Sequence, residues 1–224
     1  MNLELFIARR LALGDKKSFS RFIIRIAIVA IALSLAVMIV STCMVSGFSK
    51  EIKERIFGFW GEVHITNCDN NESFESTPLK KEQVQLDKIR KAQDVRNVAP
   101  FIIKAGILKS KTEIDGIALK GVDKEYDWKK IQTYLKDGRM LLFNDTAAVK
   151  EIMISRSTAK RLNLKVDDNV IAYFIRKDLA APLGRKLKVC GIFHTGLEEY
   201  DRQYALVDIQ LLRDLNQWKD NEVA

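Results

Sequence analysis

Twenty consecutive residues near the N-terminus carry no charge. The run from Ile26 to Val45 reads IAIVAIALSLAVMIVSTCMV. As a helix rising 1.5 Å per residue it would be about 30 Å long, which matches the hydrocarbon core of a bilayer. A buried helix of a soluble protein is the alternative, but such helices rarely extend this far without a polar face. The run therefore predicts a membrane-spanning helix.

The charges on the two sides of this run predict its orientation. The first 25 residues contain six Lys or Arg and two acidic residues, which give +4 of the +8 net charge of the 224-residue chain. The remaining charge is spread over a long region that contributes little to topology. A cleaved signal peptide would have a shorter apolar stretch of about 7–15 residues. We expect an uncleaved anchor with a cytoplasmic N-terminus and with residues after about 46 outside the cytoplasm.

Two features of the N-terminal region predict contacts with the membrane and with other helices. Residues 2–13 (NLELFIARRLAL) place apolar side chains at helical spacing beside two arginines, which favours an interfacial helix within 1–21 over a frayed terminus. Small residues four apart in the span allow another membrane helix to approach closely. These candidate helix-packing residues are Ala30 with Ser34 and Ala32 with Ala36.

The helical pattern continues beyond the span. Residues 47–60 (GFSKEIKERIFGFW) keep apolar side chains at helical intervals, and Gly58 and Gly61 are candidate stop signals. We therefore predict one helix over 22–60 that crosses the bilayer and continues as a stalk. Because no flexible linker separates the two parts, such a stalk would act as a stiff lever.

Residues 61–224 alternate short strands and helices, which predicts a mixed α+β domain. With the interfacial helix and the long transmembrane and stalk helix, the fold class is α+β. We expect strands at 61–67, 98–110, 113–123, 151–155, 170–175, 186–193 and 201–208, and helices at 79–92, 126–135, 157–164 (N-capped by Ser155) and 209–218.

The three cysteines leave the redox chemistry open. Cys43 lies in the predicted span, whereas Cys68 and Cys190 fall in the outer domain. In an oxidising compartment these two could form a disulfide. Cys190 also lies in an apolar strand, where a free buried cysteine is common.

The sequence contains no recognisable catalytic or cofactor-binding motif. It has no phosphate-binding G-x-x-x-x-G-K-[ST] loop and no G-x-S-x-G nucleophile motif. His64 and His194 belong to no zinc-spaced cluster, and the adjacent Glu198 and Glu199 are expected in a solvated loop. The scattered lysine and arginine pairs do not form a nucleic-acid surface. We expect a non-catalytic protein that needs no metal or cofactor and binds no nucleic acid.

Several segments, taken in order, resemble a known family. They are VSGFSKEIKERIFGFWGEVHI after the span, KGVD (120–123), EIMISRSTAKRLNLKVDDNV (151–170) and KVCGIFHTGLEEYDRQYALVDIQLLRDL (188–215). Together they are similar to the beginning of lipoprotein-releasing ABC transporter permeases of the LolC/LolE type, within the FtsX/MacB-like permeases that carry a MacB-like periplasmic core domain. The resemblance assigns stalk and coupling roles to Gly47, Phe48 and Gly58.

The resemblance implies a bacterial inner-membrane machine with a periplasmic domain over 61–224. Its partners would be a cytoplasmic ABC ATPase, a second permease subunit, a lipoprotein substrate and a periplasmic carrier protein. In one subunit type of the family a hairpin hooks the carrier, and the loop 176–185 occupies a similar place. The candidate carrier-binding residues are Leu179, Pro182, Leu183 and Arg185. An ordinary hairpin loop is the alternative.

The chain departs from the family in one respect. Family permeases carry three more membrane helices after the outer domain, whereas this sequence ends at Ala224 without a second span. We therefore expect a fragment whose outer domain is incomplete at its C-terminal end. The competing hypotheses are a single-pass anchored binding or sensor module, a MacB-like exporter and an FtsX-like division permease. The subunit type and the substrate are not readable from the residues.

Overall fold

The computed structural model describes residues 3–4, 6–7, 19–67, 77–144, 147–175 and 181–223. The chain divides into two compact units, Met1–Glu54 and Arg55–Ala224. In the predicted interfacial helix, residues 3–4 and 6–7 are helical, and the rest of 1–18 lies outside the described residues.

A single helix dominates the first unit. Helix α2 (Phe19–Trp60) runs without interruption for 42 residues, and its last turn already belongs to the second unit. Within residues 26–45 its apolar side chains are exposed; Leu33 and Val40, for example, are 64% and 65% exposed. The hydroxyl of Thr42 donates to the carbonyl of Met38, which satisfies a polar group inside an apolar helix. By length and composition this helix can cross a membrane.

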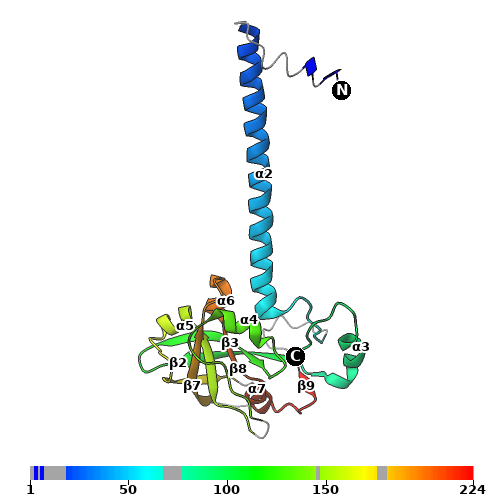
Figure 1. Ribbon diagram of the computed structural model, residues 1–224. Helices are drawn as coiled ribbons and strands as arrows, with labels where there is room; N and C mark the ends of the chain where they lie inside the picture. Colours follow the sequence, from blue (N-terminus) through cyan, green and yellow to red (C-terminus); the bar gives the residue numbers. More distant parts are fainter. Residues whose placement is uncertain are drawn as a thin grey trace. The chain divides into compact units, whose positions relative to one another are not determined.

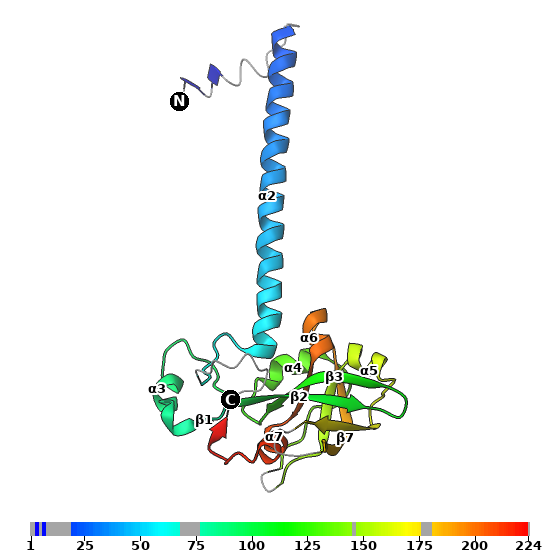
Figure 2. The ribbon, with the colours of Figure 1, turned by 180° about the vertical axis from the view of Figure 1, so that it is seen from behind.

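The second unit is built on a seven-stranded sheet in the order β4-β7-β5-β8-β3-β2-β6 (Figures 1 and 2). Strand β6 pairs with both β2 and β7, so six strands close on themselves and β4 attaches to β7. The strands are β2 (Phe101–Lys109), β3 (Ile114–Val122), β4 (Leu135–Gly138), β5 (Glu151–Ser155), β6 (Asn169–Phe174), β7 (Leu183–Phe193) and β8 (Tyr204–Asp208).

The helices of this unit begin at side-chain caps in two cases. The hydroxyl of Ser155 accepts from the backbone N–H of Thr158, which confirms the predicted N-cap, and Asp208 accepts from the N–H of Gln210. A small second sheet pairs β1 (Leu79–Lys80) with β9 (Glu222–Val223). The helices are η1 (Lys81–Gln83), α3 (Leu86–Arg90), α4 (Trp128–Tyr134), α5 (Arg156–Arg161), α6 (Glu198–Gln203) and α7 (Ile209–Asn216).

Two hydrophobic clusters fill the second unit. The larger one is mainly aliphatic and is formed by the closed strands with α5 and α7. The smaller one is rich in aromatic residues, and Phe59 from the end of α2 is one of its members. The end of α2 is therefore part of the core of the second unit.

Two predicted elements are wrong. Residues 61–67 form no strand in the structure, although their polar and apolar side chains alternate, because no neighbouring strand pairs with them among the described residues. The helix predicted over 79–92 is instead the short β1, η1 and α3 in succession, because pairing with β9 holds Leu79 and Lys80 extended. The other predicted strands and helices agree with the structure to within a few residues, except that α6 replaces the start of the strand predicted at 201–208.

Candidate functional site at the end of the long helix

The last turn of α2, Arg55–Trp60, is here called the helix foot. The helix ends at Trp60, where Gly61 adopts a φ of +88° and donates its N–H to the carbonyl of Phe57 at 2.9 Å. A left-handed residue after the last turn is a common helix stop. Gly58, predicted to end the stalk, instead lies inside the helix. A Cβ there would be 3.3 Å from the hydroxyl of Tyr134, so the missing side chain lets α4 approach.

Phe59 anchors the foot in the aromatic cluster. Its side chain is 1% exposed, and its ring centroid lies 6.0 Å from those of both Phe193 on β7 and Tyr204 on β8. Complete burial of an aromatic side chain of this size contributes about 2–3 kcal/mol. Apolar packing of Phe59 therefore holds the foot independently of its polar contacts.

A buried lysine caps the foot. Lys120 comes from β3, is 1% exposed, and donates from Nζ to the carbonyl of Phe59 at 2.5 Å. The ammonium also lies 4.5 Å from the ring centroid of Trp60 and 5.0 Å from those of Phe59 and Tyr126. Cations favour both aromatic faces and the carbonyl end of a helix. Against these contacts, burial lowers the pKa of Lys120 from 10.5 to about 7.

Two more side chains contact the last two carbonyls of the foot. The hydroxyl of Tyr126 donates to the same Phe59 carbonyl at 2.5 Å, and burial raises the pKa of this phenol. The Nε2 of His64 donates to the carbonyl of Trp60 at 2.7 Å. Helix ends leave several carbonyls without intrahelical partners. Here side chains from three different segments satisfy the carbonyls of Phe59 and Trp60.

A second contact holds the other side of the foot. The Nη1 of Arg55 donates to the carbonyl of Thr195 at 2.8 Å. Asp201, 1% exposed, fixes this turn by accepting from the backbone N–H and the hydroxyl of Thr195 at 3.1 and 2.9 Å, and its Oδ2 lies 2.7 Å from Nδ1 of His194. Gly196 has a φ of +79°, and a Cβ on it would collide with the Arg55 guanidinium. The turn is therefore shaped to receive Arg55.

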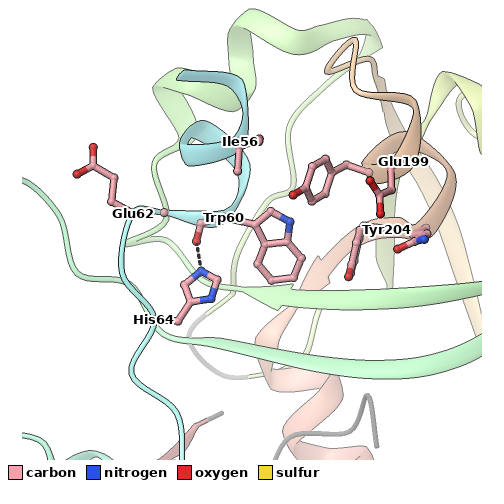
Figure 3. Close-up of a pocket in the computed structure, with 9 residues that line it drawn as sticks. Ile56, Trp60, Glu62, His64, Glu199 and Tyr204 are labelled. Atoms are coloured by element: carbon pink, nitrogen blue, oxygen red, sulfur yellow. Dashed lines mark hydrogen bonds between the residues drawn. The ribbon is translucent and has the colours of Figure 1, made fainter. Parts of the chain in front are cut away.

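A pocket of about 630 Å³ opens beside the foot (Figure 3). Its walls include three large aromatic rings: the centroid of the Trp60 ring lies 4.9 Å from that of Tyr204 in an edge-to-face arrangement and 6.3 Å from that of Tyr200. All of its lining residues belong to the second unit. They are Ile56, Trp60, Gly61, Glu62, His64, Glu199, Tyr200, Gln203 and Tyr204.

The contacts around the helix foot attach the end of α2 to the rest of the second unit, and this attachment is here called the joint. Among the described residues, no three His, Cys, Asp or Glu side chains gather as metal ligands. What the residues do is fasten a helix to a domain, by aromatic packing at Phe59, a buried ammonium at Lys120 and a guanidinium at Arg55. The helix foot is thus attached directly to β3 and to the turn before α6.

The structure places the predicted stalk and packing residues as follows. Gly47 and Phe48 lie within α2 in the first unit, and Phe48 is 67% exposed. The four small residues of the span are exposed on the same helix, and their proposed packing role stays a prediction. They are Ala30, Ala32, Ser34 and Ala36.

The predicted carrier-binding loop is shorter than expected. β7 begins at Leu183, which pairs with Phe174 of β6, so Leu183 and Arg185 are strand residues. Leu183 packs against the larger cluster and is only partly exposed, whereas Pro182 is exposed. Leu179 lies outside the described residues. The reason for the difference is that the β6–β7 ladder extends three residues further than the apolar pattern of β7 suggested.

Sequence reasoning missed Lys120, Arg55 and the pocket, and it assigned Glu198 and Glu199 to a loop although both lie in α6. One signal for Lys120 was available. It stands in the apolar strand IDGIALKGV, between Leu119 and Gly121, where a charged residue needs a buried partner. The partner is a backbone carbonyl 61 residues away in the chain, which no spacing rule identifies.

Comparison with known proteins agrees with this description. LolC of Buchnera aphidicola, a lipoprotein-releasing system transmembrane protein, is 25% identical over 231 residues, covering 97% of this chain and 53% of the relative. LolE of Haemophilus influenzae is 22% identical, covering 93% of this chain and 50% of the relative. The chain thus spans about half the length of these curated relatives.

Two solved structures match part of this chain with low scores. The periplasmic region of MacB from Actinobacillus actinomycetemcomitans matches with a TM-score of 0.47 and 17% identity, over 72% of this chain and 64% of that one. The extracellular domain of the transporter YknZ matches with a TM-score of 0.45 and 18% identity, over 65% and 70%. The model of the MacB-like periplasmic core domain matches residues 26–223, and the chain therefore belongs to that family.

Proposed function

We propose that this chain acts as a permease subunit of an ABC transporter and couples ATP hydrolysis in the cytoplasm to work in the periplasm. ATP would be hydrolysed by a separate ATPase chain, and a second permease subunit would complete the membrane part. Family membership and the names of the relatives support this class of protein. The proposed division is an interfacial helix over 1–21, a transmembrane and stalk helix over 22–60 and a periplasmic domain over 61–224.

The observation that carries the proposal is the continuity of α2. Its 42 residues correspond to a length of about 63 Å, of which the hydrocarbon core takes about 30 Å. The helix then ends in a foot where the carbonyl and ring of Phe59 and the guanidinium of Arg55 are held by other segments of the second unit. A helix without a hinge and with a fixed end can transmit displacement, which a flexible tether cannot.

We further propose that the cargo is a lipoprotein extracted from the inner membrane, because the relatives with the names LolC and LolE belong to lipoprotein-releasing systems. In this proposal the loop before β7 contacts the periplasmic carrier that accepts the lipoprotein. The candidate contacts are Leu179, Pro182, Leu183 and Arg185.

The coupling proposal is tested by inserting two glycines after Gly47 in the chain reconstituted with its ATPase and partner subunit. We expect ATP hydrolysis to continue while lipoprotein release falls at least tenfold, because a hinge in α2 absorbs the displacement. The matched control inserts two glycines after Lys111, in the exposed turn between β2 and β3. Undiminished release from the first variant, or failure of any ABC ATPase to associate with the chain, would contradict the proposal.

The carrier contact is tested separately with Leu179→Asp and Pro182→Asp, measured as capture of the carrier by the assembled complex. Leu183→Asp is unsuitable, because Leu183 packs against the larger cluster and its replacement should destabilise the fold. Loss of capture by both variants, with normal capture by Lys111→Asp, is the expected result. Normal capture by both would show that this loop is not the carrier-binding site.

A further inference from the structure

The pocket beside the helix foot has the composition of a site for an organic cation. Three aromatic rings, from Trp60, Tyr200 and Tyr204, line it: Trp60 is inclined by 58° to Tyr200 and by 87° to Tyr204, and the two tyrosine rings are inclined to each other by 30°. These rings offer aromatic surface to a group in the pocket, and aromatic faces attract ammonium and guanidinium groups. At about 630 Å³ the pocket is large enough for a side chain with flanking backbone.

The charge of the lining favours a cation as well. Glu62 and Glu199 line the pocket, and no lysine or arginine does; the Lys120 ammonium, 4.5 Å from the Trp60 ring centroid, is buried and is not part of the lining. In Figure 3 the carboxylate of Glu199 lies next to Tyr204, while Glu62 points to the outer rim. Glu199 is exposed and makes no ion pair among the described residues, in contrast to its neighbour Glu198, which lies 3.7 Å from Arg202. A carboxylate acceptor selects a ligand with N–H donors, such as a primary ammonium or guanidinium, over a quaternary one.

Two further observations indicate that the bound cation belongs to a polypeptide. The indole Nε1–H of Trp60 is shielded from solvent and has no hydrogen-bond acceptor among the described residues, and a peptide carbonyl would supply one. The segment 61–67 runs from the pocket with the alternating sequence of a strand, is exposed throughout, and joins no ladder among the described residues. Val63 is 81% exposed. Such a segment offers main-chain groups to an added peptide strand, while a pocket selects one of its side chains.

We propose that this pocket binds a lysine or arginine side chain of an extended polypeptide that lies along residues 61–67. Trp60, Tyr200 and Tyr204 surround the cation, and Glu199 accepts its N–H groups. The site lies on the helix foot, so an occupied pocket stiffens the joint. This binding depends on neither transport nor lipoprotein as the cargo.

The test uses the full chain in lipid nanodiscs with its three tryptophans replaced by 5-fluorotryptophan. ¹⁹F spectra are recorded during titration with acetyl-Ala-Lys-Ala-amide, and the Trp60 signal is identified from Trp60→Phe. We expect a saturable shift of that signal alone. Replacing lysine in the probe by norleucine, which keeps the aliphatic chain and removes the charge, should abolish the shift. An equal shift with norleucine would overturn the proposal.

Matched variants locate the contacts. Glu199→Gln should weaken binding about fivefold, and Tyr200→Leu about threefold, as expected for a partly exposed ion pair and one cation–π contact. Glu198→Gln, on the same helix but outside the lining, should bind within twofold of the unchanged chain. The signals of Trp128 and Trp218 report that each variant is folded. Equal affinities of Glu199→Gln and Glu198→Gln would overturn the site, and tetramethylammonium binding as tightly as the lysine peptide would overturn the polypeptide ligand.

Discussion

Lys120 shows how one side chain can make the stability of a domain depend on pH. Its pKa is about 7 in the folded domain because burial disfavours the ammonium, and the exposed lysine of the unfolded chain keeps the ordinary value of 10.5. Between these two values the unfolded state binds more protons. The free energy of unfolding therefore rises as the pH increases from 7 toward 10.5.

The first prediction is that Lys120→Met removes this dependence. From pH 7 to pH 9 the free energy of unfolding of the unchanged chain should rise by about 2 kcal/mol relative to that of the variant. It is measured at each pH by urea unfolding of the second unit, followed by tryptophan fluorescence. Other titrating groups are common to both proteins and cancel in the difference. Lys129→Met, at an exposed position of α4, is the matched control and should keep the full dependence. If the free energies of unfolding of the unchanged chain and of Lys120→Met change in parallel with pH, the amine of Lys120 is not desolvated.

The second prediction concerns Cys190. Its side chain is 3% exposed, its thiol lies 3.5 Å from the carbonyl of Ile152, and burial raises its pKa to about 12. The thiolate is the reactive form, so this cysteine should be inert. In a chain with Cys43 and Cys68 replaced by serine, we expect no labelling by iodoacetamide at pH 8 within an hour and complete labelling in urea. Rapid labelling of the folded chain would contradict the burial of β7.

At the scale of elements, the helix foot and the turn before α6 form one mechanical contact. The foot supplies Arg55, and the turn supplies the carbonyl of Thr195, held in place by the buried Asp201. Gly196 combines a φ of +79° with a position against the guanidinium, so only glycine fits both requirements. The contact is local, yet it joins segments 140 residues apart.

The third prediction is that Gly196→Ala loosens this contact. The added methyl group is strained at a positive φ and displaces Arg55, which should cost about 1–3 kcal/mol of unfolding free energy. Trypsin should then cleave after Arg55 at least five times faster than in the unchanged chain. Gly116→Ala, where a Cβ meets nothing within 4 Å, is the control and should change neither quantity appreciably. If both variants resist trypsin equally, Arg55 is not held by this turn.

At the scale of the whole molecule, charge decides which side of the membrane each part occupies. The net charge of +4 ahead of Ile26 favours a cytoplasmic N-terminus, because positively charged flanks remain on the cytoplasmic side. The helix that follows is long and apolar enough to cross the bilayer. The MacB-like domain would then lie outside the cytoplasm.

The fourth prediction tests this topology with single cysteines in a chain whose own three cysteines have been replaced. Lys111→Cys, in the exposed β2–β3 turn, should react with a membrane-impermeant maleimide in intact spheroplasts. Lys16→Cys should react only after the cells are lysed. The opposite pattern would place the domain in the cytoplasm and would exclude the proposed function.

The elements were largely predictable, because each depends on local patterns. The span follows from an uncharged run, and β2, β3 and β5 follow from apolar strands bounded by polar turns. Ser155 was identified as a cap from its position alone. The exceptions are instructive: 61–67 alternates like a strand but lacks a paired neighbour, and β7 begins earlier than its apolar pattern because β6 extends the ladder.

What the sequence by itself determined is the long apolar helix and the mixed character of the domain, and its flanking charges predict the orientation of that helix, because hydrophobic length, flanking charge and periodicity act between near neighbours. Only the tertiary structure decided where α2 ends and what holds it there. Lys120, Arg55 and Tyr204 are far from one another in the chain, and closure of the strands brings them to one helix foot. A buried ammonium or an aromatic pocket exists only after that closure, since both depend on the exclusion of water by distant segments.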